Sequence, residues 1–87
     1  MKSLVFMESK AKISKIEQYI IDFIYKLRKE KNLNQADIAT IIGVSRVFVT
    51  NVENPSNRAK YNIDHINALA DHFGMSPRDF LPERAII

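Results

Sequence analysis

The chain has no cysteine and no tryptophan among its 87 residues, and it has only two glycines and three prolines. Without cysteine, disulfide bonds and thiolate metal sites are excluded. The low glycine and proline content argues against a low-complexity chain. No apolar run approaches the roughly 20 residues of a membrane-spanning helix. Leu4–Met7 is too short for the apolar core of a signal peptide, so we expect a cytoplasmic protein.

Charge is modest in total but uneven along the chain. The formal net charge is +3, and residues 1–31 carry eight Lys or Arg against four acids. A basic N-terminal part fits a polyanionic partner, although small cytoplasmic domains often carry a few extra lysines. A chain of this length allows one small domain. Its stability should be modest unless it dimerises.

Apolar residues recur at helical spacing, and no segment alternates with period two. The first helix should follow a capping box at Ser14 and Glu17 and end near Asn32. The next two should run over about residues 35–42 and 45–53, and a fourth from Asn62 to the glycine at 74. The stripes expected to face the core are Ile16, Tyr19, Ile20, Phe23, Ile24 and Leu27 in the first helix and Ile63, Ile66, Leu69, Ala70 and Phe73 in the fourth.

The C-terminal part predicts a short fifth helix. Ser76 can cap it, Pro77 suits its first position, and Pro82 stops it. Phe80 and Leu81 are its apolar anchors. We therefore expect an all-α domain of five helices over residues 14–82, with an arm at 1–13 and a tail at 83–87.

The two short helices on either side of Gly43 form the most specific pattern. Glycine accepts the positive φ needed where the earlier helix ends, and Ser45 can cap the later one. A turn this short makes the helices cross steeply, as in the helix-turn-helix that places its second helix in a DNA major groove. Facing apolar residues would hold the pair together: Ile38, Ala39 and Ile42 against Val49 and Val52, with Phe48 at the flank or turned toward DNA.

With its valines 49 and 52 turned to the core, the second of these helices would present a recognition face of Arg46, Val47, Thr50 and Asn51. Arg46 can donate two hydrogen bonds to guanine, and Asn51 can pair with adenine. Val47 and the Thr50 methyl group can pack on a thymine methyl. Taken alone, Arg46 and Asn51 would be ordinary exposed residues, but the preceding helix and turn favour recognition.

A second set of residues suits the phosphate backbone. The helix before Gly43 begins with free N–H groups and the positive end of its dipole, so Asn34 and Gln35 should hold a phosphate. Asn54 would add a further phosphate contact. Arg58 and Lys60 lie in the loop that follows and can reach phosphates or a minor groove. A solvated loop explains these two side chains equally well.

At these residues the chain resembles the phage-repressor helix-turn-helix family (Cro/cI-type, xenobiotic-response-element), over about residues 20–82. Gln35, Gly43 and Glu53 at these spacings are specific as a set, whereas each alone is weak. The resemblance implies a lambda-repressor-like DNA-binding fold, with a phosphate at Gln35. It also implies a partly buried ion pair between Arg28 and Glu53. The positions that it implies for base contacts are those of Arg46, Val47 and Asn51.

These features predict a sequence-specific double-stranded DNA-binding transcriptional regulator, interpreted as a repressor. We expect a homodimer, because one short helix offers few contacts for specificity. The alternative is a protein-interaction module on the same fold, such as an antitoxin that binds a toxin, or an adaptor. Apolar residues available for a dimer contact are Leu4, Val5 and Phe6 at one end and Phe80, Ala85, Ile86 and Ile87 at the other.

No constellation of residues suggests catalysis or a cofactor. There is no Ser-His-Asp set, glycine-rich phosphate loop or paired-carboxylate cleft. His65 and His72 lie seven residues apart, whereas a helical metal pair usually lies four apart with further ligands nearby. We therefore expect neither an enzyme nor a metal protein.

Overall fold

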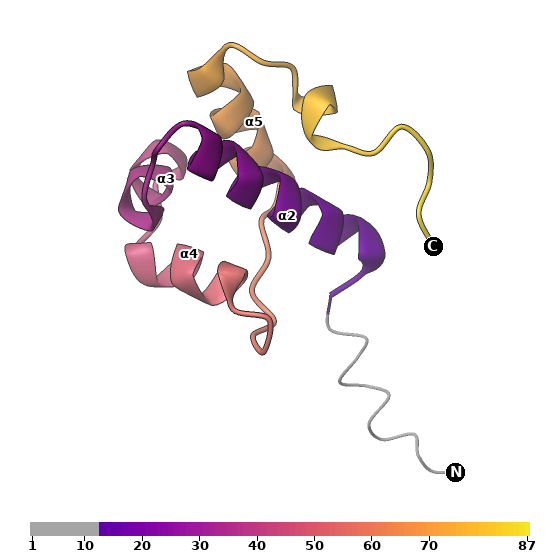
Figure 1. Cartoon of the computed structure of the whole chain (residues 1–87), viewed down its shortest axis with the longest axis horizontal. Coiled ribbons are helices and arrows are strands. Elements are labelled where there is room, and N and C mark those ends of the chain that lie inside the picture. Colours follow the sequence, from indigo (N-terminus) through magenta and orange to yellow (C-terminus); the bar gives the residue numbers. More distant parts are fainter. Residues whose placement is uncertain (1–12) are drawn as a thin grey trace, which may run out of the picture.

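The computed structural model describes residues 13–87, which form four α-helices and a short 3-10 turn and contain no β-strand (Figure 1). The predicted all-α class is therefore confirmed for these residues. Of the arm predicted at residues 1–13, all but Ile13 lies outside the described residues. The helices are α2 (Lys15–Glu30), α3 (Gln35–Ile42), α4 (Arg46–Glu53) and α5 (Ile63–Phe73), followed by the turn η1 (Pro77–Phe80).

Helix α2 crosses the middle of the molecule (Figure 1) and packs on α4 and η1. Helix α3 packs on both α4 and α5, whereas η1 touches α2 and α5. A loop over residues 54–62 leads from α4 to α5 without regular structure. None of the helices in the described part of the chain is long and apolar enough to cross a membrane.

The helix ends follow from local capping chemistry. The backbone N–H of Ser14 donates to Glu17 Oε1 at 2.9 Å, and the N–H of Glu17 donates to Ser14 Oγ at 3.2 Å, so the predicted capping box is formed. Gly43 ends α3 with φ 75°. A residue with a side chain would adopt this positive φ only at a cost in free energy. Ser45 Oγ then accepts from the N–H of Phe48 at the start of α4. The predicted break between α3 and α4 is confirmed.

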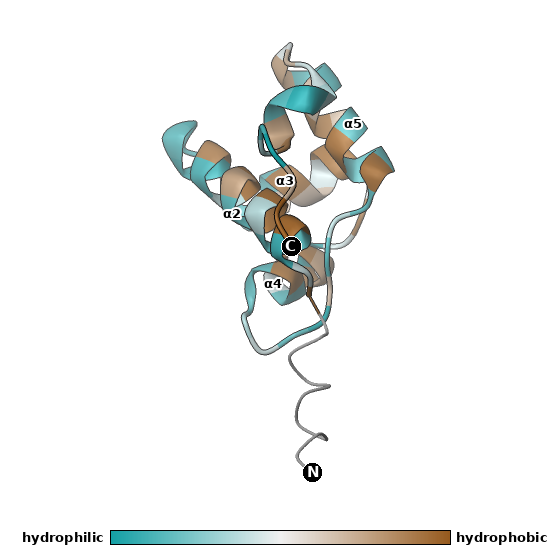
Figure 2. Cartoon of the chain, turned by 90° about the vertical axis from the view of Figure 1, so that its right-hand side faces the viewer, coloured by the Kyte–Doolittle hydropathy of each residue, from teal (hydrophilic) through white to brown (hydrophobic). Residues whose placement is uncertain are grey.

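The core is one cluster of apolar side chains drawn from every element. Brown and teal bands alternate along the helices in Figure 2, as expected of helices with one buried face. Three residues assigned to the buried stripes are instead exposed, which corrects the prediction: Ile63 is 68% exposed and Ile16 and Tyr19 are 38% exposed. Ile16 and Ile63 stand in the first turns of α2 and α5, and periodicity cannot tell whether another element covers the end of a stripe.

The predicted fifth helix is wrong in type, because Pro77–Phe80 form a single 3-10 turn. Ser76 and Asp79 make the expected reciprocal cap, but Leu81 precedes a proline and is extended, with φ −110° and ψ 151°. The helix therefore has no room for a second turn. Phe80 is fully buried, with its ring 5.0 Å from that of Phe23. It belongs to the core and not to the dimer surface predicted for it.

The phenol of Tyr61 fixes the loop between α4 and α5 to the core. Tyr61 is 7% exposed, and its hydroxyl is buried without a hydrogen-bond partner among the described residues. Burial raises the pKa of this phenol, so it stays neutral. An unsatisfied buried hydroxyl costs free energy.

Tyr61→Phe should therefore leave the free energy of unfolding unchanged or raise it by up to about 1 kcal/mol. Urea denaturation followed by circular dichroism measures the difference. A loss of more than about 1 kcal/mol would mean that the hydroxyl has a partner in solution. His65→Phe, at the neighbouring ring, serves as a comparison, because it removes a nitrogen that does accept a hydrogen bond.

Candidate nucleic-acid interface

A two-pronged ion pair ties α2 to the end of α4. Arg28 Nε donates to Glu53 Oε2 at 2.8 Å, and Arg28 Nη2 donates to Glu53 Oε1 at 2.7 Å. Both side chains are 9% exposed. The remaining guanidinium nitrogen, Nη1, donates to the carbonyl of Leu33 at 3.1 Å. The pair implied by the family resemblance is present, and it satisfies each nitrogen of the guanidinium.

Arg28 and Glu53 each stabilise the charged form of the other. Burial raises the pKa of Glu53, but the hydrogen bonds from Arg28 and Gln35 outweigh it and leave the pKa below its ordinary value. The hydrogen bond with Glu53 likewise raises the pKa of Arg28. Glu53 is therefore a carboxylate at neutral pH, which only accepts hydrogen bonds.

Gln35 connects the ion pair to the exposed side of α4. Its Nε2 donates to Glu53 Oε1 at 2.9 Å, and its Oε1 accepts from the Thr50 hydroxyl at 2.8 Å. Both polar ends of Gln35 are thus engaged within the protein. A phosphate at this end of α3 would meet the start of the helix, where main-chain N–H groups lack partners within the helix. The phosphate contact at Gln35 remains a prediction.

The recognition face lies together on the outer side of α4. Arg46, Val47 and Thr50 are exposed and Asn51 is half-buried, and Val47 is 65% exposed. The spacing of these positions, one turn apart in pairs, puts them on one face of a helix. On the other face the two valines, 49 and 52, are buried as predicted. The geometry leaves the four predicted base-contacting residues available to a partner.

The two asparagines predicted to hold phosphates also cap backbone. Asn34 Oδ1 accepts from the N–H of Asp37 at the start of α3, at 2.9 Å. Asn54 Oδ1 accepts from the N–H of Ser56 at 2.9 Å, which shapes the exit from α4. Their side-chain amide nitrogens remain the groups suited to a phosphate. Both contacts remain predictions.

The basic loop residues separate in the structure. Arg58 is exposed. Lys60 Nζ instead lies 2.9 Å from Glu17 Oε2, at the start of α2. Because both side chains of this pair are partly exposed, the pair is weak and its lysine can be drawn to another anion. Arg58 could therefore meet a phosphate as it stands, whereas Lys60 would have to exchange Glu17 for the phosphate.

Phe48 supports α4 from the inner side. Its ring packs edge-on against the rings of Tyr61 and His65, at 6.2 and 5.3 Å. Of the two placements considered for Phe48, the structure shows the core flank. His65 Nδ1 also accepts from the N–H of Asn62 at 3.1 Å, and burial lowers the pKa of His65. The sequence analysis missed this capping role of His65. The signal for it was a polar side chain three residues after the cap residue Asn62.

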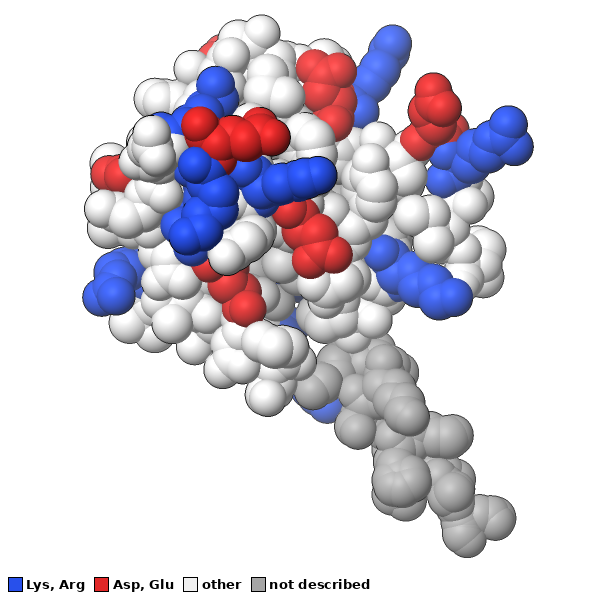
Figure 3. Space-filling view, in the orientation of Figure 1, with Lys and Arg blue, Asp and Glu red and all other residues white. Residues whose placement is uncertain are grey.

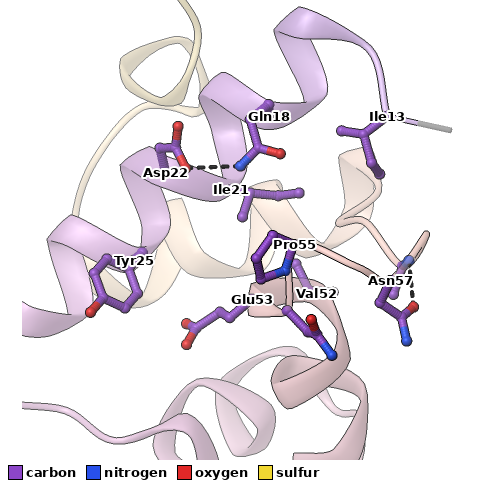
Figure 4. Close-up of a pocket in the computed structure, with 11 residues that line it drawn as sticks. Ile13, Gln18, Ile21, Asp22, Tyr25, Val52, Glu53, Pro55 and Asn57 are labelled. Carbon is purple, nitrogen blue, oxygen red and sulfur yellow. Dashed lines mark hydrogen bonds between the residues drawn. The ribbon is translucent and has the colours of Figure 1, made fainter. Parts of the chain in front are cut away.

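A cavity of about 390 Å³ opens between α2 and the segment that ends α4 (Figure 4). Ile21 and Val52 are among its apolar lining residues, and its charged lining residues are Asp22 and Glu53. Asp22 accepts a hydrogen bond from Gln18 at 2.9 Å. The cavity shares Asn54 with the candidate interface, but its acidic lining does not attract a phosphate backbone.

Charges of both signs share the face of the molecule seen in Figure 3. Lys and Arg side chains stand among Asp and Glu there and form no continuous basic patch on that face. No group of three or more His, Cys, Asp or Glu side chains in the described residues is arranged to hold a metal ion. On this face, charge alone therefore does not mark a surface for a polyanion.

Comparison with known proteins identifies the same region. The family model described as Helix-turn-helix (HTH_3) matches residues 24–80, from the second half of α2 to the end of η1. The matched segment includes the Arg28–Glu53 pair, Gln35 and the whole of α4. No curated protein and no solved structure matched the chain.

Proposed function

Because the chain belongs to the Cro/cI-type helix-turn-helix family, we propose that it is a sequence-specific regulator of transcription that inserts α4 into the major groove of double-stranded DNA. The observation that best supports this is the recognition face. Three of its four residues are exposed, it carries Arg46 and Asn51, and its helix is held in place by the buried pair of Arg28 and Glu53. A rigid platform is what base-specific readout requires.

The chemistry of each side chain suggests its role in the proposed complex. Arg46 donates a forked pair of hydrogen bonds to guanine O6 and N7, and Asn51 pairs with adenine N6 and N7. Val47 offers a methyl surface to thymine. Phosphates fix the register, at the N-terminus of α3 beside Asn34 and Gln35 and at Asn54, Arg58 and Lys60.

We further propose that two copies act together as a repressor. A dimer would place two α4 helices about 34 Å apart, one turn of DNA, on a palindromic site. Doubling the contacts supplies affinity that eight residues of α4 alone do not. In the described residues, Ile87 is 96% exposed and Ala85 is exposed, so the tail retains apolar surface for the second copy. The predicted N-terminal surface of Leu4, Val5 and Phe6 lies outside the described residues.

Substitution of the recognition face should abolish selectivity and leave the fold intact. Arg46→Ala and Asn51→Ala should each weaken binding to the preferred duplex by about 5- to 150-fold, since a good bidentate base contact contributes roughly 1–3 kcal/mol. Fluorescence anisotropy with duplexes from a selected pool, including the region upstream of the gene, measures this. Binding should also fall steeply with salt, with a log–log slope of magnitude about 5 or more.

Arg78→Ala is the matched control, because it removes an exposed arginine from η1, at a distance in sequence from the recognition face. It should leave binding within about twofold. Equal, weak binding to every duplex, with Arg46→Ala and Asn51→Ala behaving as the parent protein does, would contradict the proposal. A protein partner, as in the antitoxin or adaptor alternative, would then be the function to test.

A further inference from the structure

The orientation of the Gln35 amide is set by the buried ion pair. Arg28 is always protonated, and its forked contact with Glu53 keeps the latter a carboxylate. A carboxylate accepts hydrogen bonds and donates none. The group of Gln35 that lies 2.9 Å from Glu53 Oε1 must therefore be the NH2 group. The amide oxygen of Gln35 consequently faces Thr50.

This orientation decides what the Thr50 hydroxyl does. Its oxygen lies 2.8 Å from Gln35 Oε1 and 3.1 Å from the main-chain carbonyl oxygen of Arg46. Both neighbours accept hydrogen bonds and neither has a hydrogen to give. The single hydroxyl hydrogen of Thr50 is thus committed to one of them. If Gln35 moved away, the Arg46 carbonyl would still take it.

The part of Thr50 that remains free is an acceptor. The residue is exposed, and its oxygen keeps lone pairs that are not used by the hydrogen bond to Gln35 or Arg46. A threonine whose hydroxyl can turn reads a base donor or a base acceptor equally well. Here the hydroxyl does not rotate to donate outward, because that would break a hydrogen bond that the protein already makes.

We propose that Thr50 reads its base pair through the exocyclic amino group, adenine N6 or cytosine N4, by accepting a hydrogen bond from it. Guanine O6 and thymine O4 are acceptors, and Thr50 has no hydrogen to offer them. This inference rests on the proposed function and adds to it which edge of the base pair one residue recognises. It replaces the thymine-methyl contact that the sequence predicts for Thr50 with a polar one.

The test compares the parent protein with Thr50→Val, which keeps the shape and loses the acceptor, and with Thr50→Ser, which keeps the hydroxyl. Selection from a random duplex pool first locates the base pair whose preference changes in Thr50→Val. Duplexes are then made with the amino group at that base pair deleted, by purine in place of adenine or pyrimidin-2-one in place of cytosine. A uracil-for-thymine duplex deletes the methyl group where the pair is A·T.

Deleting the amino group should weaken binding by the parent protein and by Thr50→Ser by about 3- to 10-fold, the effect of one hydrogen bond. Binding by Thr50→Val should change much less, and this variant also corrects for any effect of the analogue on base pairing. Deleting the thymine methyl should have little effect on binding, and the effect should be the same for the parent protein and for Thr50→Ser.

Two results would overturn the inference while leaving the proposed function intact. One is selective binding in which the Thr50→Val preference matches the parent protein at every position. The other is a loss on methyl deletion with none on amino deletion. If the parent protein selects no sequence at all, the proposed function falls together with the inference. Thermal unfolding of each variant confirms that the fold is retained in every comparison.

Discussion

Glu53→Ala should lower the free energy of unfolding by about 3–5 kcal/mol, because it leaves the guanidinium of Arg28 buried and unpaired. Arg28 is 8% exposed, and two of its three nitrogens donate to Glu53. Gln35 loses its carboxylate acceptor in the same variant. A loss of this size is a large share of the stability of a domain of this length. Urea denaturation followed by circular dichroism measures it.

The matched control is Lys60→Ala, which breaks an exposed ion pair to Glu17 and should cost at most about 1 kcal/mol. Replacing both partners together, by Arg28→Met with Glu53→Leu, should recover most of the loss, because no charge remains buried. The low pKa of Glu53 adds a pH signature. Its contribution is complete above the ordinary pKa of 4.5 and is lost as the pH falls through the lower folded value. A Glu53→Ala loss below about 1 kcal/mol would show that the pair behaves as an exposed one.

The sequence predicted the helix boundaries well because capping is a local matter. Ser14, Ser45 and the glycine at 43 act on atoms within a few residues along the chain. The chemistry that ends each helix is therefore visible in a short window of sequence. The same holds for the valines that bury the inner side of α4, since their three-residue spacing already separates the two faces.

Features that depend on distant residues could not be predicted in this way. Ile63 continues an apolar stripe, yet no element in the described part of the chain covers it enough to bury it. Thr50 and Gln35 are fifteen residues apart, and their hydrogen bond depends on how α3 and α4 pack. The sequence therefore predicted a phosphate role for Gln35 and a methyl contact for Thr50. It could not show that the two side chains meet.

Phe80→Ala should lower the free energy of unfolding by about 3–5 kcal/mol, although it lies in a turn of only four residues. Phe80 is fully buried, and it packs edge-on against Phe23 of α2. Because η1 touches both α2 and α5, this one ring fills the space where those helices meet the C-terminal segment. The loss therefore combines the transfer of the ring to water with the cavity left behind.

Leu81→Ala is the comparison that makes the argument about Phe80 specific. Leu81 is adjacent and apolar but 40% exposed, so its replacement should cost less than about 1 kcal/mol. Equal losses for the two variants would mean that the C-terminal segment is held by its overall length and not by the buried ring. If the prediction holds, the short η1 turn persists because its Ser76 cap orders the backbone and its one aromatic side chain is anchored in the core. The main contacts of η1 are with α2 and α5. Duplex binding by the folded Phe80→Ala protein, measured well below its unfolding temperature, should therefore match that of the parent protein.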